Sequence, residues 1–443
     1  SIDKPLLNRA LRGTYPPGST YKPFMALAAL NTGKRSASQV IMDGGSFSFG
    51  NHVFRSHGDR GLGAVDMYRS IVKSSNVYYY SLANELGVDL MHDQMAPLGF
   101  GRKTGIDLQN ESTGILPSTA WKRRYYKRPE QQKWYAGETI SLGIGQGYNA
   151  FTPLQLASAT ATLVSGGQRF KPRLVREIED VVTHERRRIA SDALEPLPYK
   201  PEHIALLLRA MHGVTQEGTS TRVFAGAPYK SGGKTGTAQA VGVKANQKYD
   251  ASKLEEHKRD HSLYIAVAPL PDPTLVVAVI VENAGFGAAA AAPIARRVFD
   301  FVLLGHYPSE EDVAATRKGQ SAAPIGAPRQ IADVPLPGQL LTAPPLAIAP
   351  APAASRCCSA RRGASGSSRW WSATTPGSRW RSSCWRRSAW SRCTRPASTT
   401  APASSTTGAT CCWRWACCSW CRRCRRSGWR SWRCRCTCWA WRC

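Results

Sequence analysis

The sequence predicts an α+β fold in which an antiparallel sheet is flanked by helices and joined to an all-helical subdomain. Helix signals dominate the first half of the chain, and strongly β-branched runs appear only later, at 263–267 and 275–281. An apolar segment at 292–304 follows them and has the length of a helix that packs on the sheet. Helices first, then strands and a closing helix, is an order typical of α+β domains.

Individual elements are bounded by residues with clear capping or turn preferences. Asn31-Thr32-Gly33 ends the first apolar helix, and Thr152-Pro153 begins another, with Thr152 as its N-cap. The prolines between 269 and 273 separate two antiparallel strands, and 234–241 predicts a third strand. The expected helices are 20–30, 67–73, 77–86, 153–163, 203–213 and 292–304.

The C-terminal part of the sequence has a composition unlike the rest. Residues 356–443 contain all 14 cysteines, 12 of the 14 tryptophans and 19 arginines, but no Leu, Ile, Val, Phe or Tyr. Without aliphatic residues this segment cannot build a packed core, and its composition is typical of GC-rich DNA translated out of frame. A disordered basic tail and a metal module around Cys421 and Cys424 are the alternatives.

Composition therefore divides the chain into three parts. Residues 1–306 form one globular domain, 307–355 a Pro- and Ala-rich linker, and 356–443 the tail, expected to be disordered. The tail arginines supply 19 of the 29 net positive charges and leave +10 on residues 1–355, so the charge does not indicate a nucleic-acid partner. No signal peptide or apolar run of about 18 residues is found, and we expect that any membrane anchor is missing here.

Three short motifs occur in a fixed order. They are Ser19-Thr20-Tyr21-Lys22, Ser74-Ser75-Asn76 and Lys234-Thr235-Gly236-Thr237, which read S-x-x-K, S-x-N and K-T-G. Each string alone is common and has a structural explanation as a helix cap or a glycine hairpin. Together they are the signature of enzymes that open an acyl bond with a serine. The string at 233–235 is not a phosphate loop, because Pro228 stands where the first glycine is required.

The first motif places a nucleophile and a base on one helix. Ser19 begins the helix and Lys22 follows one turn later on the same face, so the amine can reach the hydroxyl. A lysine becomes a base when burial or a neighbouring cation lowers its pKa, and Lys234 of the third motif is such a cation. From the second motif, we expect the Ser74 hydroxyl to relay a proton and the Asn76 amide to bind a substrate amide.

The third motif is predicted to hold the substrate. Thr235 and Thr237 offer hydroxyl groups to a substrate carboxylate, and Gly236 leaves room for a substrate backbone along the strand. The backbone amides of Ser19 and Thr237 are positioned to donate to the oxyanion that forms when a carbonyl is attacked.

Longer strings around the motifs resemble the penicillin-binding protein and serine β-lactamase superfamily, and within it the class B transpeptidase domains of the penicillin-binding protein 2 family. The strings are 12–23 (RGTYPPGSTYKP), 143–148 (GIGQGY), 152–155 (TPLQ) and 234–239 (KTGTAQ). The resemblance covers residues 8–307, and Asp260-His261 before a strand fits the same group.

The resemblance implies a peptidoglycan D,D-transpeptidase of cell-wall elongation with Ser19 as nucleophile and no cofactor. Its substrates would be stem peptides ending in D-Ala-D-Ala and an acceptor amine, and β-lactams would acylate the same serine. The parent protein would be anchored in the inner membrane, with this domain in the periplasm and a membrane glycosyltransferase as partner. A D,D-carboxypeptidase, a β-lactamase, a non-catalytic β-lactam sensor and a structural scaffold are the alternatives.

Some relatives of this kind carry a structural metal ahead of the second motif. Asp43, His52, His57 and Asp59 are the residues that could bind one here. Since no cysteine accompanies them and their spacing is loose, we expect solvated loop residues and no metal site.

Overall fold

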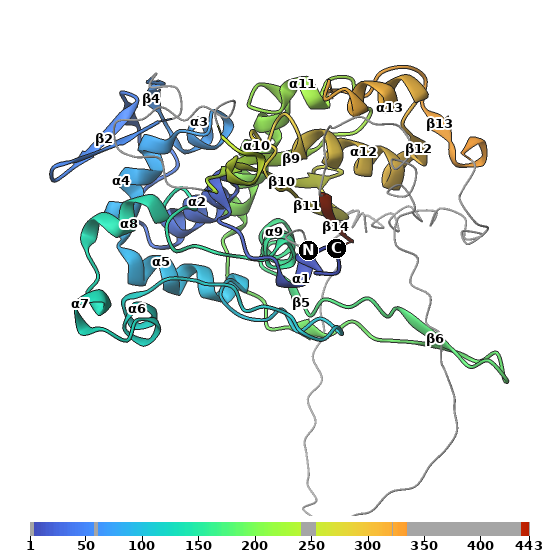
Figure 1. The fold of residues 1–443 in the computed structure, drawn as a ribbon, viewed down its shortest axis with the longest axis horizontal. Coiled ribbons are helices and arrows are strands. Elements are labelled where there is room, and N and C mark those ends of the chain that lie inside the picture. The colour runs from blue at the N-terminus through green and yellow to red at the C-terminus, as the bar shows by residue number, and fades with distance from the viewer. Residues whose placement is uncertain (1–3, 57–60, 241–253, 321, 335–435, 443) are drawn as a thin grey trace, which may run out of the picture. The chain divides into compact units, whose positions relative to one another are not determined.

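The computed structural model describes residues 4–56, 61–240, 254–320, 322–334 and 436–442, all within one compact unit. Its central element is a four-stranded antiparallel sheet in the order β14-β11-β10-β9 (Figure 1). The strands are β9 (Gly232–Ala238), β10 (His261–Ala268), β11 (Leu275–Val281) and β14 (Cys436–Arg442). Lys234 of β9 lies opposite Ile265 of β10, so the third motif runs along one side of β10.

Both faces of the sheet are covered by helices. On one face, Tyr264 and Val279 pack with α12 (Ala291–Leu304) and α11 (Thr221–Phe224). On the other face, Leu263 and Ile280 join the main core with α9 (Pro153–Val164) and α10 (Pro201–Gln216). Strands buried on both faces are apolar at every position, which explains the continuous apolar runs in the sequence.

The main core is built around α2 (Lys22–Asn31), the helix that begins with Lys22. Its residues 22–29 are all buried, and the rings of Phe24 and Phe100 meet edge to face with centroids 5.2 Å apart. A helix that is apolar on all sides has to lie inside a domain, so the first motif lies against the core. Its neighbours are α3 (Met67–Val72), α4 (Asn76–Leu86), α5 (Val88–Met95) and α10 (Figure 1).

Shorter elements complete the described part of the chain. The helices are α1 (Arg9–Arg12), α6 (Thr119–Tyr125), α7 (Pro129–Gln132), α8 (Ala136–Leu142), α13 (Glu310–Arg317), and the 3-10 helices η1 (Gly18–Tyr21), η2 (Ala96–Leu98), η4 (Glu256–Lys258) and η5 (Ile331–Asp333). The two-stranded sheets are β1 (Ile41–Asp43) with β4 (Gly63–Val65), β2 (Ser46–Phe49) with β3 (His52–Arg55), β5 (Arg169–Phe170) with β8 (Ala193–Leu194), β6 (Glu177–Glu179) with β7 (Arg186–Arg188), and β12 (His306–Tyr307) with β13 (Arg329–Gln330).

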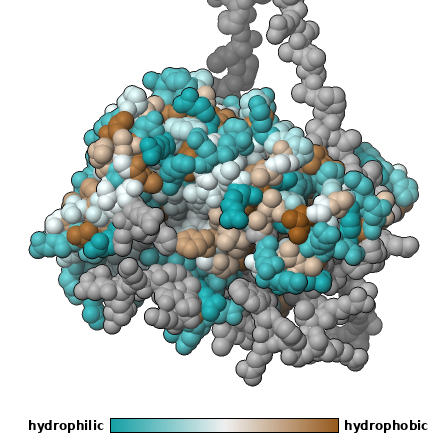
Figure 2. All heavy atoms as spheres, turned by 90° about the horizontal axis from the view of Figure 1, so that it is seen from above, coloured by the Kyte–Doolittle hydropathy of each residue, from teal (hydrophilic) through white to brown (hydrophobic). Residues whose placement is uncertain are grey.

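One face of the molecule is shown in Figure 2. The face seen in Figure 2 is mostly hydrophilic, and its hydrophobic residues are scattered in small patches. Within the described ranges, no helix has the length and apolar character needed to cross a membrane.

The predicted fold class and the predicted helices and strands are confirmed, with small changes at their ends. The first helix begins two residues later than predicted, because Gly18–Tyr21 form the 3-10 helix η1. The helix predicted at 203–213 is longer at both ends, since Pro201 occupies its first turn. The third strand begins two residues earlier than predicted and ends at Ala238, before the predicted end at 241; residue 241 itself lies outside the described residues.

Residues 307–320 and 322–334 contain regular structure, although their composition predicts a flexible linker. Strands β12 and β13 pair, and α13 begins at Ser309, whose hydroxyl accepts the Asp312 amide. Arg297 of α12 donates to both carboxylate oxygens of buried Asp312, with one distance of 2.8 Å. This ion pair holds the segment on α12, and composition alone gives no sign of it. Residues 335–355 of the predicted linker lie outside the described residues.

Part of the predicted tail also forms a regular element. Cys436–Arg442 pair with all seven residues of β11. The seven-residue run of β11 is buried throughout, and the amide and carbonyl groups on its outer edge need partners. The backbone supplies these partners whatever the side chains, so the absence of aliphatic residues does not prevent the pairing. Residues 356–435 and 443 lie outside the described residues.

Replacing Arg297 with glutamine is expected to lower the free energy of unfolding by about 2 kcal/mol. The change removes the ion pair and leaves the Asp312 carboxylate, which is 2 % exposed, without its cation. Urea denaturation followed by circular dichroism measures the loss. Arg187→Gln, on the exposed strand β7, is the matched control and should change the free energy by less than about 0.5 kcal/mol. Equal losses in the two variants would contradict the proposed contact.

Candidate active site

The first motif lies on a tight turn that faces the motif strand β9. Ser19 belongs to η1 and is half-buried. The Gly18 amide donates to the Gly145 carbonyl at 2.9 Å, and Gly18 has a left-handed φ of +55°. A Cβ atom on Gly18 would lie 2.5 Å from the carbonyl oxygen of Thr237. Only glycine fits this position, and it brings Ser19 beside the third motif.

Lys22 joins the first motif to the second. Its side chain is fully buried, and its Nζ lies 2.7 Å from the Ser74 carbonyl, 3.1 Å from the Ser74 hydroxyl and 2.7 Å from Asn76 Oδ1. The spacing predicts a direct contact with Ser19. No hydrogen bond between Lys22 Nζ and the Ser19 hydroxyl occurs among the described residues, because the amine is turned toward the second motif.

Ser74 is the residue at which the motifs converge. Its hydroxyl also accepts a hydrogen bond from Lys234 Nζ at 2.8 Å, and Lys234 is fully buried. Ser74 has a φ of +59°, which is uncommon and costly for a residue other than glycine. The next residue, Ser75, caps α4 by accepting the Tyr78 amide at 3.1 Å. The capped helix fixes the turn and so fixes the Ser74 hydroxyl between the two lysines.

The predicted substrate-binding residues lie around this centre. Asn76 accepts from Lys22 through Oδ1, and no hydrogen bond from its Nδ2 to a described residue is present, so the amide group can still donate. Thr235 is buried, and its hydroxyl contacts the Thr219 hydroxyl at 2.7 Å. Thr237 is half-buried, and its carbonyl accepts from Gln146 Nε2 at 3.1 Å.

The two lysines have different electrostatic surroundings. Burial lowers the pKa of Lys22 well below its ordinary value, the Lys234 cation lowers it further, and the Asp43 carboxylate opposes both effects. Burial lowers the pKa of Lys234 to about 7. Because the Lys234 cation disfavours a second charge on Lys22, these effects favour the state in which Lys22 is neutral and Lys234 is charged.

The hydrogen bonds around Lys22 fit a neutral amine. A neutral lysine has two N–H donors and one lone pair. The two donors are used by the Ser74 carbonyl and Asn76 Oδ1, which can only accept. In the neutral form the lone pair can face the Ser74 hydroxyl, 3.1 Å away, and that hydroxyl can then donate to Lys22 while it accepts from Lys234. This arrangement can pass a proton between Ser74 and Lys22.

Comparison with known proteins decides the family. The model of the penicillin-binding protein transpeptidase domain matches residues 1–300. The chain belongs to the penicillin-binding protein transpeptidase family. It is 40 % identical over 316 residues to the peptidoglycan D,D-transpeptidase MrdA of Haemophilus influenzae, covering 70 % of this chain and 48 % of that protein. The corresponding protein of Escherichia coli K12 is 35 % identical over 333 residues, covering 72 % of this chain and 50 % of its own length.

Solved structures of this transpeptidase family have the same fold. Pseudomonas aeruginosa PBP2 in complex with WCK 5153 is 36 % identical with a TM-score of 0.59, covering 69 % of this chain and 64 % of that one. Helicobacter pylori PBP2 in complex with MreC is 26 % identical with a TM-score of 0.58, covering 69 % and 52 %. The chain spans about half the length of the curated relatives it matches.

Asp43 is buried, although the sequence predicts a solvated loop residue at this position. It is 2 % exposed, and its carboxylate accepts from the Ser75 hydroxyl at 2.5 Å and from the Gly45 amide at 2.9 Å. A lone acid among polar loop residues carries no sign of burial, so the sequence could not reveal this contact. His52 is exposed on β3, and residues 57 and 59 lie outside the described residues. Within the described ranges, no group of three or more His, Cys, Asp or Glu side chains could hold a metal ion.

Gly236 has a packing role that the sequence analysis did not predict. A Cβ atom there would lie 2.8 Å from the Thr20 methyl group and 3.0 Å from the Pro17 carbonyl oxygen. On this side the space is therefore occupied by η1, and the glycine allows the turn with Ser19 to pack directly on β9. Sequence reasoning also missed Gln146 and Thr219, which contact the third motif. Gln146 lies in a string that resembles the family, whereas Thr219 belongs to no motif.

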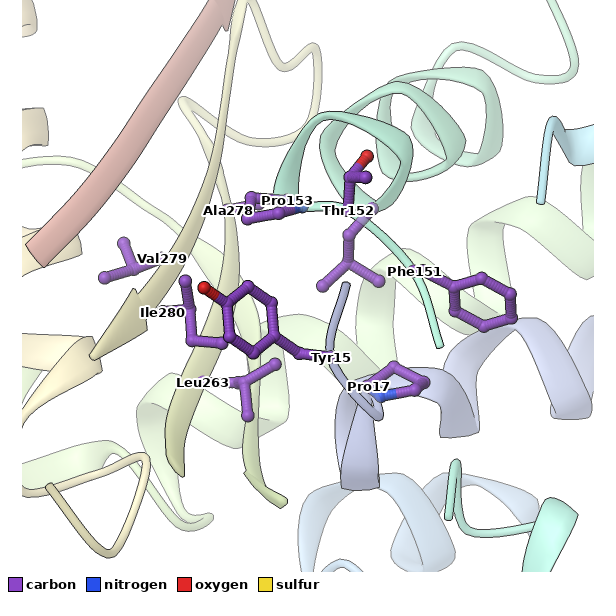
Figure 3. A pocket seen from close by; sticks show the side chains of 10 residues that line it. Tyr15, Pro17, Phe151, Thr152, Pro153, Leu263, Ala278, Val279 and Ile280 are labelled. Atoms are coloured by element: carbon purple, nitrogen blue, oxygen red, sulfur yellow. The ribbon is translucent and has the colours of Figure 1, made fainter. Parts of the chain in front are cut away.

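A small hollow lies nearby but is not the active site. Its lining comes from the segments that precede η1 and α9, from α9 itself, and from β10 and β11. Tyr15, Phe151 and Ile280 are among the lining residues (Figure 3). Its volume of about 10 Å³ has room for about one water molecule. None of the lysines or serines that converge at Ser74 lines it, so it is not part of the candidate active site.

Two charge-removing variants are expected to move the pKa of Lys22 in opposite directions. Lys234→Gln removes a cation that lowers this pKa, so the pKa should rise. Asp43→Asn removes a carboxylate that raises it, so the pKa should fall. Carbon-13 NMR of lysine labelled at Cε, titrated against pH, measures both shifts.

The Lys22 resonance can be assigned by its absence from the spectrum of Lys22→Met. Glu177→Gln, on the exposed strand β6, is the matched control and should leave the Lys22 titration in place. Shifts of the same sign in Lys234→Gln and Asp43→Asn would contradict the electrostatic account.

Proposed function

We propose that this domain is a peptidoglycan D,D-transpeptidase that cross-links stem peptides through a Ser19 acyl-enzyme and is acylated by penicillin. The observation that carries the proposal is the Ser74 hydroxyl held between Lys22 and Lys234 at 3.1 and 2.8 Å. In this proposal Lys22 is the neutral base, Ser74 relays protons and Lys234 is the cation. The chain belongs to the transpeptidase family, and the half-buried Ser19 is the nucleophile.

Acylation starts from Ser19. Its Oγ attacks the carbonyl carbon of the penultimate D-Ala, and the hydroxyl proton passes to the neutral amine of Lys22, either directly or through Ser74. Catalytic hydrogen bonds often tighten only when substrate is bound, and here the Lys22 lone pair must turn from Ser74 to Ser19 or use Ser74 as a bridge. The amides of Ser19 and Thr237 would donate to the oxyanion.

Collapse of the tetrahedral intermediate breaks the bond to the terminal D-Ala. The leaving amine takes a proton from the Ser74 hydroxyl, and Ser74 regains one from the ammonium group of Lys22. The acyl-enzyme then holds the shortened stem peptide as an ester of Ser19. An amine on a neighbouring strand attacks this ester, its proton returns to Ser19 by the same route, and the cross-link is complete.

The remaining motif residues recognise the substrate in this account. The Lys234 ammonium group and the hydroxyls of Thr235 and Thr237 provide positive charge and donors for the terminal carboxylate. The free Nδ2 of Asn76 would donate to a stem-peptide carbonyl. A penicillin offers a carboxylate and a reactive amide carbonyl with a similar arrangement, so it would acylate Ser19 as well.

We infer that the parent protein works in cell-wall elongation at the inner membrane. The curated relatives are named peptidoglycan D,D-transpeptidase MrdA, and one similar structure is a PBP2 in complex with MreC. Another, 32 % identical with a TM-score of 0.57, belongs to a peptidoglycan synthase complex that coordinates polymerization and crosslinking. These relatives support a membrane anchor, a periplasmic domain and a membrane glycosyltransferase as partner.

Incubation with a penicillin followed by intact-mass measurement and peptide mapping tests the proposal. We expect one adduct, located on the peptide that contains Ser19, and no adduct on the variant Ser19→Ala. Ser36→Ala, at an exposed serine, is the matched control and should be labelled like the unmodified chain. Labelling that persists in Ser19→Ala would place the nucleophile elsewhere.

Turnover then separates a transpeptidase from the other members of the superfamily. With a D-Ala-D-Ala stem peptide and an acceptor amine, we expect D-Ala release together with a cross-linked product. D-Ala release without a cross-link would indicate a D,D-carboxypeptidase, and rapid hydrolysis of the penicilloyl ester would indicate a β-lactamase. Labelling with no turnover of any peptide would indicate a sensor.

A further inference from the structure

The segment 121–135, which spans most of α6 and all of α7, carries an unbalanced positive charge. Its exposed side chains include five cations and a single acid, Glu130. The one ion pair that the described residues form in this segment belongs to the buried Lys122. The exposed cations are Arg123, Arg124, Lys127, Arg128 and Lys133. None of them forms an ion pair with a described residue; Arg123 donates to Thr119 at 3.4 Å, and Lys133 lies over the Tyr135 ring.

The other exposed run of arginines in the described chain is neutralised by its neighbours. On the β6–β7 hairpin, Arg186 contacts Glu177 and Glu179 at 3.8 and 2.8 Å, and Arg188 contacts Glu177 at 3.8 Å. That hairpin thus presents a surface of mixed charge, whereas segment 121–135 presents one sign. A surface of one sign attracts a ligand of the opposite sign.

Lys122 anchors the segment to the body of the domain. Its Nζ donates to both oxygens of Glu138 on α8, at 2.5 and 2.6 Å. The rings of Trp134, Tyr135 and Tyr148 surround it, with centroids 5.4 to 5.6 Å from Nζ. A buried ion pair with cation–π contacts on several sides holds the backbone in place, so the exposed cations stand on a fixed support. Figure 1 shows α6 and α7 beside each other.

The residues that hold segment 121–135 in place are also connected to the candidate active site. Tyr148 donates to Glu138 at 2.9 Å, and it ends the 143–148 string that follows α8. Within that string, Gly145 accepts from Gly18 at 2.9 Å and Gln146 donates to Thr237 at 3.1 Å. Segment 121–135 and the site around Ser19 are therefore tied to the two ends of one short unit, α8 and its following loop.

Aromatic faces accompany the cations. Tyr125 is 59 % exposed, and Trp121 stacks on it with ring centroids 5.0 Å apart. Tyr135 is 53 % exposed, but the Nζ atoms of Lys122 and Lys133 both lie 5.5 Å from the centroid of its ring. Exposed aromatic rings offer flat apolar faces for sugar rings, and arginine and lysine pair with carboxylates. A ligand that contacts both the aromatic rings and the cations has pyranose rings and several carboxylates. Such a ligand is larger than the single stem peptide that reacts.

We propose that segment 121–135 binds the peptidoglycan strand that carries the reacting stem peptide or its acceptor, a refinement that rests on the proposed function. The carboxylates of neighbouring stem peptides contact the exposed cations, and the glycan lies against Tyr125. The fixed link through α8 keeps the strand in line with Ser19, so the segment contributes affinity for polymer and none for a free small substrate.

Binding of fluorescently labelled, uncross-linked peptidoglycan strands to the full chain tests this proposal. The variants Arg123→Gln/Arg124→Gln and Lys127→Gln/Arg128→Gln should each weaken strand binding about tenfold at low salt, and high salt should reduce the difference. The matched control Arg186→Gln/Arg188→Gln removes the same charge and should bind strands like the unmodified chain. Glycan strands stripped of their stem peptides should bind weakly to every protein.

Penicillin acylation of Ser19, measured in parallel, separates this proposal from the proposed function. All three double variants should be acylated at the rate of the unmodified chain. Normal acylation with undiminished strand binding in both segment variants would overturn the strand-binding proposal alone, as would tight binding of stripped glycan. Loss of binding to vesicles containing phosphatidylglycerol, with strand binding unchanged, would assign the segment to a membrane surface instead. An unmodified chain that penicillin does not acylate would overturn the proposed function.

Discussion

The hydroxyl of Ser74, shared by two buried lysines, is the contact on which the rest of the site depends. Two ammonium groups this close would repel each other in a medium of low dielectric constant, so one of them must give up its proton. Lys22 is the lysine whose pKa the charge of the other lowers, and a neutral Lys22 can turn its lone pair to Ser74 while its two N–H groups bond the acceptor-only oxygens. Lys234 remains the donor. A serine hydroxyl between them then links a base to a cation.

The fold brings together the three segments that carry Lys22, Ser74 and Lys234. α2 is buried on all sides and carries Lys22 into the core, while β9 brings Lys234 in from the sheet. The turn before α4 supplies Ser74. Asp43 stabilises that turn by accepting a hydrogen bond from the Ser75 hydroxyl. Gly18 and Gly236 let η1 and β9 approach closely. The desolvation that lowers the pKa of Lys22 is therefore a consequence of the packing that also stabilises the domain.

The sequence predicts the parts that depend on local patterns. Apolar runs and capping residues predicted α2, α9, β10 and β11 well, and the three motifs named the residues that meet at Ser74. Contacts between distant segments could not be predicted in the same way. Nothing local distinguishes Asp43 from a solvated acid, and nothing in residues 307–334 shows that Asp312 pairs with Arg297. The direction of the Lys22 amine, toward Ser74 and away from Ser19, is likewise set by tertiary packing.

The pH dependence of penicillin acylation tests the central claim most directly, namely that one lysine is neutral while the other is charged. The rate should rise with pH as Lys22 loses its proton and fall again as Lys234 loses its own near pH 7, giving a bell-shaped profile. Rates measured by mass spectrometry at constant ionic strength from pH 4 to 10, with folding checked at each pH, provide this profile. A rate that increases steadily to pH 10 would contradict the account, because it would mean that Lys234 need not be charged and that the base titrates like an ordinary lysine.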